Sequence, residues 1–124
     1  MPAAETANPE LTALVPVFNE AANVPALVER LTRVLDGCAA SHEIIFVDDG
    51  SSDGTLEAIR AAREQDRRID AISFSRNFGK EVAIAAGLDH ARGRAVVILD
   101  ADLQHPPETI EAMAAKWREG YENV

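Results

Sequence analysis

The sequence predicts an α/β fold with a mainly parallel sheet and helices on both faces of that sheet. Stretches rich in branched apolar residues alternate four times with stretches whose apolar residues recur at helical spacing. The links between them are short, and strands joined by helices in this way pair in parallel. The stretch IIFV (44–47) is apolar throughout, as expected of a strand that is covered on both faces.

The first predicted strand is LTALVPV (11–17), and an amphipathic helix follows it. We expect Asn19 to cap the start of this helix, and Asp36-Gly37 to end it with the glycine in the left-handed conformation. The apolar residues of the helix recur at i, i+3, i+4, i+7 and i+11 and share one face: Val24, Leu27, Val28, Leu31 and Leu35.

Three further strand–helix pairs complete the prediction. The strands are expected at 43–49, 69–75 and 95–100, and the first two helices at about 55–67 and 80–91. Gly87 lies inside the second of these helices and costs about 1 kcal/mol relative to alanine.

The last predicted helix begins with Pro106 or Pro107 in its first turn. Residues 1–9 are expected to form a flexible tail, residues 10–124 one domain, and residues 121–124 the start of a fifth strand. The apolar stripe of the last helix is Ile110, Met113, Ala114 and Trp117.

Composition limits the partners and the location of the chain. It has 124 residues, 47% of them hydrophobic, with a net charge of −9 and a pI of about 4.7. A chain with this much negative charge binds polyanions poorly, and we therefore expect no nucleic-acid partner. Cys38 is the only cysteine, which excludes an internal disulfide and a cysteine zinc site. The absence of a signal peptide and of an apolar stretch near ~18 residues predicts a soluble, cytoplasmic chain.

Polar residues gather where each predicted strand ends. In open α/β sheets, ligands bind beyond the carboxyl ends of the strands, which meet at one edge of the sheet. Four separate segments are therefore expected to converge there. They are Pro16–Glu20, Asp48–Ser51, Ser75–Lys80 and Asp100–His105.

Asp100 and Asp102 are the candidate metal ligands. Residues two apart in an extended segment point the same way and lie about 6.5–7 Å apart along the chain. Two carboxylates that close favour a neighbouring cation, and Mg²⁺ or Mn²⁺ suits carboxylate oxygen while leaving positions for phosphates. Gln104 could add a carbonyl oxygen. The alternative is that these acids only cap the helix that follows.

The stretch DDGSSDGT (48–55) combines two roles. Asp53 is expected to cap the next helix, and Gly50 and Gly54 to form the turn before it. Asp48 and Asp49 end the strand itself, where no cap is needed. A carboxylate there can accept a hydrogen bond from a base N–H or a ribose hydroxyl.

Three further residues have an open role. Arg76 and Lys80 are the cations nearest the predicted edge, and each either binds a phosphate or is a solvated surface charge. Phe18 either stacks on a base or packs against the protein.

The motifs that carry these residues resemble a known family. They are VPVFNEAANV, EIIFVDDGSSDGT, SRNFGKEVAIAAGLDHARG and VVILDADLQHPPE, in this order, and the resemblance covers about residues 11–120. The sequence resembles family 2 of the inverting nucleotide-sugar glycosyltransferases. Within it, the sequence is most similar to the polyprenyl-phosphate (dolichyl-phosphate mannosyltransferase-like) sugar transferases.

The resemblance implies a glycosyltransferase-A (Rossmann-like) fold that binds a UDP- or GDP-sugar with Mg²⁺ or Mn²⁺. It implies that Asp100-Ala101-Asp102 is the family's DxD motif, with Asp102 the firmest metal ligand and Gln104 a helper. Both acids would act in catalysis and in donor binding. The resemblance assigns the nucleotide to Pro16, Phe18, Glu20, Val47, Asp48, Asp49 and Lys80, with Val47 and Asp49 at the base and ribose.

The implied reaction is transfer of a sugar, with inversion, to an acceptor such as a polyprenyl phosphate of the cell envelope. Family members are longer than 124 residues, so we expect a truncated chain that holds the N-terminal, nucleotide-binding half and lacks the acceptor half. A full-length protein with membrane helices would act at the cytoplasmic face of the membrane. An incomplete sheet leaves an open edge, which predicts self-association into a homo-oligomer.

Three alternatives differ in class. A nucleotide-sugar-binding fragment without catalysis is the main one. A phospho-acceptor receiver domain is disfavoured, since it needs an acid pair after the first strand, where this chain has PVFNE. A dinucleotide oxidoreductase is disfavoured because the first strand–helix turn has no glycine fingerprint.

Overall fold

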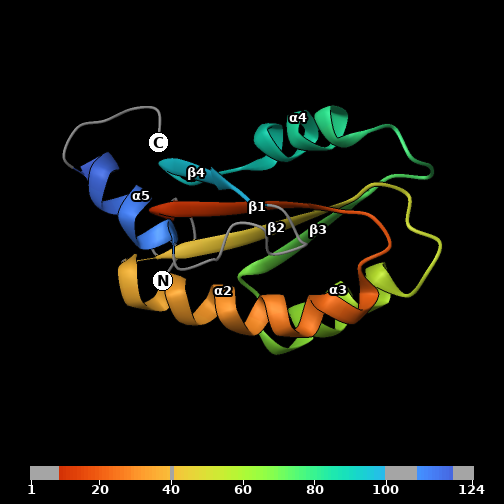
Figure 1. Cartoon of the computed structure of the whole chain (residues 1–124), viewed down its shortest axis with the longest axis horizontal. Coiled ribbons are helices and arrows are strands. Elements are labelled where there is room, and N and C mark those ends of the chain that lie inside the picture. Colours follow the sequence, from red (N-terminus) through yellow and green to blue (C-terminus); the bar gives the residue numbers. More distant parts are fainter. Residues whose placement is uncertain (1–8, 40, 100–108, 119–124) are drawn as a thin grey trace, which may run out of the picture.

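The computed structural model describes residues 9–39, 41–99 and 109–118. Strands and helices alternate along the chain, as the sequence predicts (Figure 1). The strands are β1 (Leu11–Val17), β2 (His42–Asp48), β3 (Ile69–Ser73) and β4 (Ala95–Ile98). The helices are the 3₁₀ turn η1 (Ala21–Asn23), then α2 (Val24–Cys38), α3 (Thr55–Gln65), α4 (Lys80–His90) and α5 (Thr109–Arg118).

The four strands form one sheet in the order β3-β2-β1-β4, and every pair is parallel. The predicted parallel sheet is therefore confirmed. β1 is central, since it pairs with β2 along its whole length and with β4 from Leu11 to Leu14. The register sets Val17 beside Asp48 and Asp48 beside Ser73, so the carboxyl ends of β1, β2 and β3 lie level with one another.

Helices cover both faces of the sheet, as predicted. α2, α3 and α5 lie on one face, and α4 lies on the other (Figure 1). Along β1, alternate side chains point to opposite faces. Ala13 and Val15 therefore belong to the larger apolar cluster, with Phe46, while Leu14 belongs to the smaller one, with Val47.

The predicted apolar face of α2 is confirmed, but both of its predicted ends are wrong. Val24, Leu27, Leu31 and Leu35 are buried, and Val28 packs against them. At the start, η1 intervenes with Glu20 at its cap position, so the cap position of α2 is Asn23 rather than Asn19.

The end of α2 also differs from the prediction. Gly37 stays inside the helix, and its φ is not positive. The helix ends one residue later, at Cys38, and Ala39 leaves in the extended conformation with φ −127° while its N–H bonds the Leu35 carbonyl. Because the chain leaves the helix in an extended conformation at Ala39, no glycine in the left-handed conformation is needed there.

Other predicted boundaries shift by one or two residues. β2 begins and ends one residue earlier than expected, and α3 and β3 each end two residues earlier. Ile110 and Ala114 of α5 are buried, as predicted. β4 ends at Ile98, earlier than the predicted strand 95–100, since Leu99 is described outside the strand. Other predictions lie outside the described residues: residues 1–8 of the predicted tail 1–9, the start of the last helix, and the strand 121–124.

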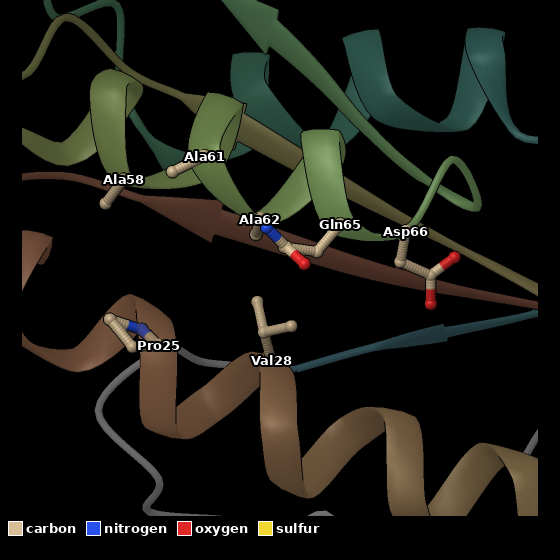
Figure 2. Close-up of a pocket in the computed structure, with 7 residues that line it drawn as sticks. All are labelled: Pro25, Val28, Ala58, Ala61, Ala62, Gln65 and Asp66. Atoms are coloured by element: carbon tan, nitrogen blue, oxygen red, sulfur yellow. The ribbon is translucent and has the colours of Figure 1, made fainter.

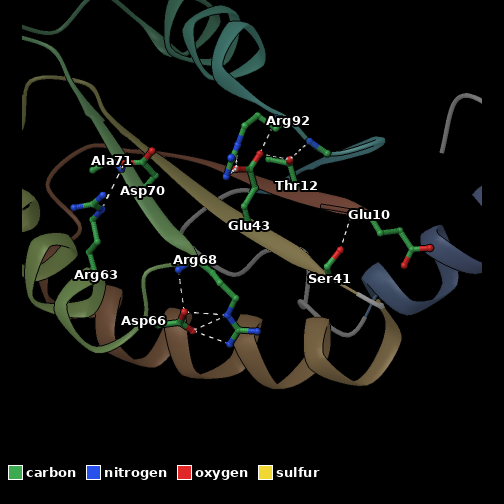
Figure 3. A network of polar contacts seen from close by, with 11 residues as sticks. Glu10, Thr12, Ser41, Glu43, Arg63, Asp66, Arg68, Asp70, Ala71 and Arg92 are labelled. Atoms are coloured by element: carbon green, nitrogen blue, oxygen red, sulfur yellow. Dashed lines mark hydrogen bonds and ion pairs between the residues drawn. The ribbon is translucent and has the colours of Figure 1, made fainter. Parts of the chain in front are cut away.

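The amino end of the sheet is held by a buried carboxylate (Figure 3). Glu43 is 5% exposed and accepts hydrogen bonds from the Thr12 hydroxyl at 2.7 Å and from the Arg92 backbone N–H at 2.7 Å. The Arg92 guanidinium adds two more bonds to its other oxygen. This network ties β1, β2 and the α4–β4 loop together, at the opposite end of the strands from the predicted ligand edge.

Gly87 brings α4 close to β1. It is buried in the helix, and a Cβ at this position would lie 2.1 Å from Leu14 Cδ1. Leu14 is itself fully buried, so it has little room to move. The helix-propensity cost that the sequence suggested is therefore offset by a close packing contact that only glycine allows.

We expect Gly87→Ala to destabilise the protein by about 1–2 kcal/mol, because the overlap with Leu14 outweighs the gain of about 1 kcal/mol in helix propensity. The control is Gly37→Ala, since a Cβ at Gly37 meets nothing within 4 Å. That variant should be neutral or more stable by up to about 1 kcal/mol. Urea unfolding of both variants measures the difference. A Gly87→Ala protein as stable as the wild type would contradict the packing argument.

His42 begins β2 as a buried histidine with an unsatisfied ring nitrogen. It is 4% exposed, and among the described residues its Nε2 has no hydrogen-bond partner. Burial lowers the pKa of His42, and the nearby Arg68 guanidinium lowers it further, while Asp36 and Asp66 act in the opposite direction. The folded state therefore favours the neutral ring.

We expect the free energy of unfolding to fall as the pH drops below about 6.5, the ordinary pKa of an unfolded histidine. Below this pH the imidazole takes up a proton in the unfolded chain but stays neutral in the folded chain. Protonation therefore favours the unfolded state, and stability is lost as the pH falls from about 6.5 to the lower pKa of the folded state. Urea unfolding at about pH 7.5 and about pH 5.5 measures the loss. His42→Gln should lose much of this dependence, and an unchanged dependence would assign it to other groups.

Candidate functional site

Three described loops emerge at the carboxyl edge of the sheet, where the sequence predicts the ligand. They follow β1, β2 and β3 and lie at the right of Figure 1. The first three of the four predicted segments therefore converge as expected. We call residues 18–20, 49–54 and 74–79 the first, second and third loops.

Hydrogen bonds join the first loop to the second. The Asn19 N–H donates to Ser51 Oγ at 2.8 Å, and the Ser52 N–H donates to Asn19 Oδ1 at 2.9 Å. The Glu20 N–H donates to Thr55 Oγ1 at 3.0 Å. Asn19 takes a left-handed backbone conformation, with φ 53°, which asparagine tolerates better than most residues. Its side chain thus binds a distant loop instead of capping the helix that follows.

Asp53 supports the start of α3 from one residue before its cap. The cap residue is Gly54, not Asp53 as predicted. The Asp53 carboxylate accepts the Thr55 N–H at 3.0 Å and also the Thr55 hydroxyl, and it reaches the Ala21 N–H at 3.3 Å. The Thr55 hydroxyl lowers the pKa of Asp53 below its ordinary value. Asp53 therefore ties the second loop to η1 and to α3 together.

Asp48 and Asp49 are both buried at the end of β2, with 3% and 5% exposure. The Ser51 N–H donates to Asp48 Oδ1 at 3.0 Å and closes the turn around Gly50. Asp49 instead reaches the third loop: its Oδ1 accepts the Phe78 N–H at 2.7 Å, and its Oδ2 accepts the Gly79 N–H at 3.0 Å. A role of either acid at a base or ribose stays a prediction.

The third loop presents aromatic and cationic side chains. Phe78 is 45% exposed, and the Arg76 guanidinium carbon lies 4.7 Å from the centre of its ring. Phe74 packs edge-on against the same ring, with centroids 5.6 Å apart. Lys80 is exposed on the first residue of α4. These cations stand at the same edge as the buried acids.

Solvent exposure differs among four further residues predicted to bind the nucleotide: Pro16, Phe18, Glu20 and Val47. Phe18 is 45% exposed, so its ring is accessible at the end of β1. Pro16 and Glu20 are half-buried, and Glu20 accepts a hydrogen bond from Asn23 Nδ2 at 2.6 Å. The Val47 side chain is fully buried in the cluster under α4, so any ligand contact there must come from its backbone.

The predicted metal ligands lie outside the described residues. The fourth segment contains Asp100, Ala101, Asp102 and Gln104, and it falls in the gap between the described ranges 41–99 and 109–118. The Leu99 N–H donates to the Leu14 carbonyl at 2.9 Å, so the chain leaves β4 alongside β1. Within the described ranges, no group of three or more His, Cys, Asp or Glu side chains could hold a metal ion.

A groove between α2 and α3 is separate from these three loops (Figure 2). It has a volume of about 360 Å³ and is lined mainly by alanines of α3, together with Pro25 and Val28 of α2. Among the described residues that line it, Asp66 alone is ionisable, and hydrogen bonds from Arg68 lower the pKa of that carboxyl. The sequence gives no signal for this groove, since it arises from small side chains on two packed helices.

Comparisons with known proteins agree on one family. The family model described as "Glycosyl transferase family 2" matches residues 12–124. YkcC of Bacillus subtilis, named an uncharacterized glycosyltransferase, is 48% identical over 111 residues, which cover 90% of this chain and 34% of that protein. An undecaprenyl-phosphate 4-deoxy-4-formamido-L-arabinose transferase of Shewanella sediminis is 42% identical over 112 residues, with the same coverage of both chains.

A solved structure supports the fold. The mannosyltransferase PcManGT from Pyrobaculum calidifontis, in complex with GDP-Man and Mn²⁺, superposes with a TM-score of 0.74 at 32% identity. The match covers 90% of this chain and 33% of that one. The chain thus spans about a third of the length of these relatives. The fold is that of the N-terminal part of a glycosyltransferase-A enzyme, and the chain belongs to glycosyl transferase family 2.

Proposed function

We propose that the chain is the donor-binding part of a metal-dependent glycosyltransferase that moves a sugar from a UDP- or GDP-sugar to a polyprenyl phosphate, with inversion. One observation carries the proposal: the family match over residues 12–124 includes the three described loops that meet at the carboxyl edge of the sheet. In α/β sheets of this type, that edge is where ligands bind.

The nucleoside is proposed to lie at the end of β1. The exposed ring of Phe18 is available to stack on a base, and Pro16 and Glu20 flank it along the chain. A relative with 32% identity was solved with a GDP-sugar, which supports a nucleoside diphosphate sugar as the donor. The base stays open between uracil and guanine.

Asp100, Asp102 and Gln104 are proposed to hold the metal ion. Their oxygen atoms suit Mg²⁺ or Mn²⁺, and Mn²⁺ is present in the solved relative. The bound cation would offset the negative charge of the departing diphosphate. Asp102 is proposed as the firmest ligand, and Lys80 adds a positive charge at the same edge.

The acceptor is proposed from chemistry and from the relatives. Several of them are named undecaprenyl-phosphate sugar transferases, which supports a polyprenyl phosphate. Such a phosphate is ionised at neutral pH, so it attacks the sugar with little help from a base. A lipid acceptor would bring the reaction to a membrane surface, and no described helix is long and apolar enough to cross a membrane.

A second candidate is a nucleotide-sugar binder that transfers nothing. The observation in its favour is that the described residues at the carboxyl edge suit a nucleotide, with an exposed aromatic ring at Phe18 and exposed cations at Arg76 and Lys80. Calorimetric titration with UDP-glucose and GDP-mannose in the presence of Mn²⁺ tests binding, and release of UDP or GDP on addition of undecaprenyl phosphate tests transfer. Binding with transfer supports the enzyme, binding alone supports the second candidate, and no binding contradicts both.

We expect Asp102→Ala to abolish Mn²⁺-dependent nucleotide binding while the fold stays intact, because the metal loses its firmest ligand. Calorimetry measures binding, and thermal unfolding checks the fold. Asp89→Ala is the control, since Asp89 is an exposed acid in the last turn of α4. Unchanged Mn²⁺-dependent affinity in Asp102→Ala would count against the metal assignment.

A further inference from the structure

Three consecutive backbone N–H groups after β1 donate to side chains that follow β2. The donors are Asn19, Glu20 and Ala21, and the acceptors, in the same order, are Ser51 Oγ at 2.8 Å, Thr55 Oγ1 at 3.0 Å and Asp53 Oδ2 at 3.3 Å. Each donor and its acceptor are 32 to 35 residues apart in the sequence. The backbone of the first loop is therefore held by side chains of another segment, and its position depends on them.

The contact between Asn19 and the second loop runs in both directions. The Asn19 N–H donates to Ser51 Oγ, and Asn19 Oδ1 accepts the Ser52 N–H at 2.9 Å. The φ of Asn19 is 53°, a left-handed conformation that is unfavourable for most residues with a Cβ. The bonds to Ser51 and Ser52 hold Asn19 in this conformation and so set the direction in which the chain leaves β1.

Phe18 lies between two residues whose backbones are held. Val17 before it is buried at the end of β1, and its carbonyl accepts the Asp49 N–H at 2.9 Å, so the pairing of β1 with β2 continues to this point. Asn19 after it is bound to the second loop. The Phe18 ring is nevertheless 45% exposed. The ring is therefore presented at the edge of the sheet on a backbone that the second loop fixes.

Asp49 is the residue of the second loop that lies beside this point. Its two carboxylate oxygens accept the Phe78 and Gly79 N–H groups, one bond each. A carboxylate oxygen can accept more than one hydrogen bond, so Asp49 keeps the capacity for the base or ribose contact that the family resemblance implies. Phe18 and Asp49 are thus two expected nucleoside contacts on different loops, and the bond between Asn19 and Ser51 joins those loops.

We propose that Ser51 is a positioning residue for the nucleoside of the donor. Through its bond to Asn19, it holds the Phe18 ring at a set distance from Asp49 before the donor binds. This inference rests on the proposed function, which places the nucleoside at the end of β1. A site whose parts are already in place binds more tightly, because the ligand does not have to select a minor conformation.

The first test needs no ligand. Ser51→Ala removes the hydroxyl that accepts the Asn19 N–H. We expect amide hydrogen exchange at Asn19 to become about fivefold faster, while the amide of Leu14, in the middle of β1, keeps its rate. Unchanged exchange at Asn19 would overturn the proposal, since the bond would then hold nothing.

The second test measures affinity for ligands with and without phosphates. Ser51→Ala should bind uridine or guanosine about fivefold more weakly than the wild type, and UDP or GDP more weakly by the same factor, because the positioned groups contact the nucleoside. The factor by which Mn²⁺ strengthens UDP or GDP binding should be the same in variant and wild type. A loss confined to the diphosphates, or no loss at all, would overturn the proposal.

Ser41→Ala is the matched control. Ser41 Oγ accepts the Glu10 N–H at 3.0 Å just before β2, as Ser51 Oγ accepts the Asn19 N–H just after it, and Figure 3 shows the first of these bonds. Both variants remove a serine hydroxyl that binds a residue next to β1, but at opposite ends of the sheet. Ser41→Ala should leave nucleoside affinity unchanged. Equal weakening in both variants would assign the effect to general loosening of β1 and would rule out a specific role of Ser51.

A double-mutant cycle tests whether Ser51 acts through Phe18. Phe18→Ala should weaken UDP or GDP binding, and adding Ser51→Ala should weaken it no further, because the ring that Ser51 positions is already absent. Losses that multiply would show that Ser51 acts independently of the ring, for example by touching the donor itself, and would overturn the positioning role.

Failure of the proposed function would look different. A wild-type chain that binds neither UDP nor GDP removes the donor-binding proposal, and the role of Ser51 with it. A wild-type chain that binds either ligand, with a Ser51→Ala variant that binds it equally well, overturns the role of Ser51 alone.

Discussion

The parallel pairing of β1 with a strand on each side is the constraint on which the rest of the structure depends. All residues of β1 except Pro16 are buried, since β2 and β4 cover its edges and helices cover its faces. A strand enclosed in this way can place polar chemistry only at its ends. Because its neighbours run in the same direction, the carboxyl ends of three strands meet, and their loops become one surface.

The two ends of the sheet use buried acids in different ways. At the amino end, Glu43 accepts hydrogen bonds from a hydroxyl, a backbone N–H and a guanidinium, and these bonds hold β1, β2 and the α4–β4 loop together. At the carboxyl end, the buried Asp48 and Asp49, and the exposed Asp53 beside them, accept mainly backbone N–H groups and shape loops whose side chains remain exposed. The first arrangement gives stability, while the second gives an ordered surface that a ligand can meet.

Much of the fold could be predicted because its signals are local or periodic. The alternation of strands and helices, the apolar face of α2 and the convergence of the first three loops all follow from spacing along the chain. The start of α2 could not be predicted, because Asn19 has a partner 32 residues away in Ser51, which local capping preferences do not reveal. The bond from Arg92 to Glu43 spans 49 residues and escapes sequence reasoning for the same reason.

The candidate site also has features that could be predicted from the sequence and features that could not. The sequence indicated which residues would gather at the edge, since each follows a strand, but not that Asp49 would engage the backbone of Phe78 and Gly79. That pairing depends on how two loops fold against each other. The family resemblance identified Asp100 and Asp102 as part of a DxD motif, and their role as metal ligands stays a prediction.

The close approach at Gly87 has a consequence for the ligand edge. A helix is stiff, and Lys80 stands seven residues before Gly87, a distance of about 10 Å at 1.5 Å per residue. Gly87 allows α4 to pack close to Leu14. Because the helix is stiff, this packing distance also affects the position of Gly79 and Lys80 at its start. The absence of a side chain at Gly87 thus helps to set how far the start of α4 stands from the sheet at its carboxyl edge.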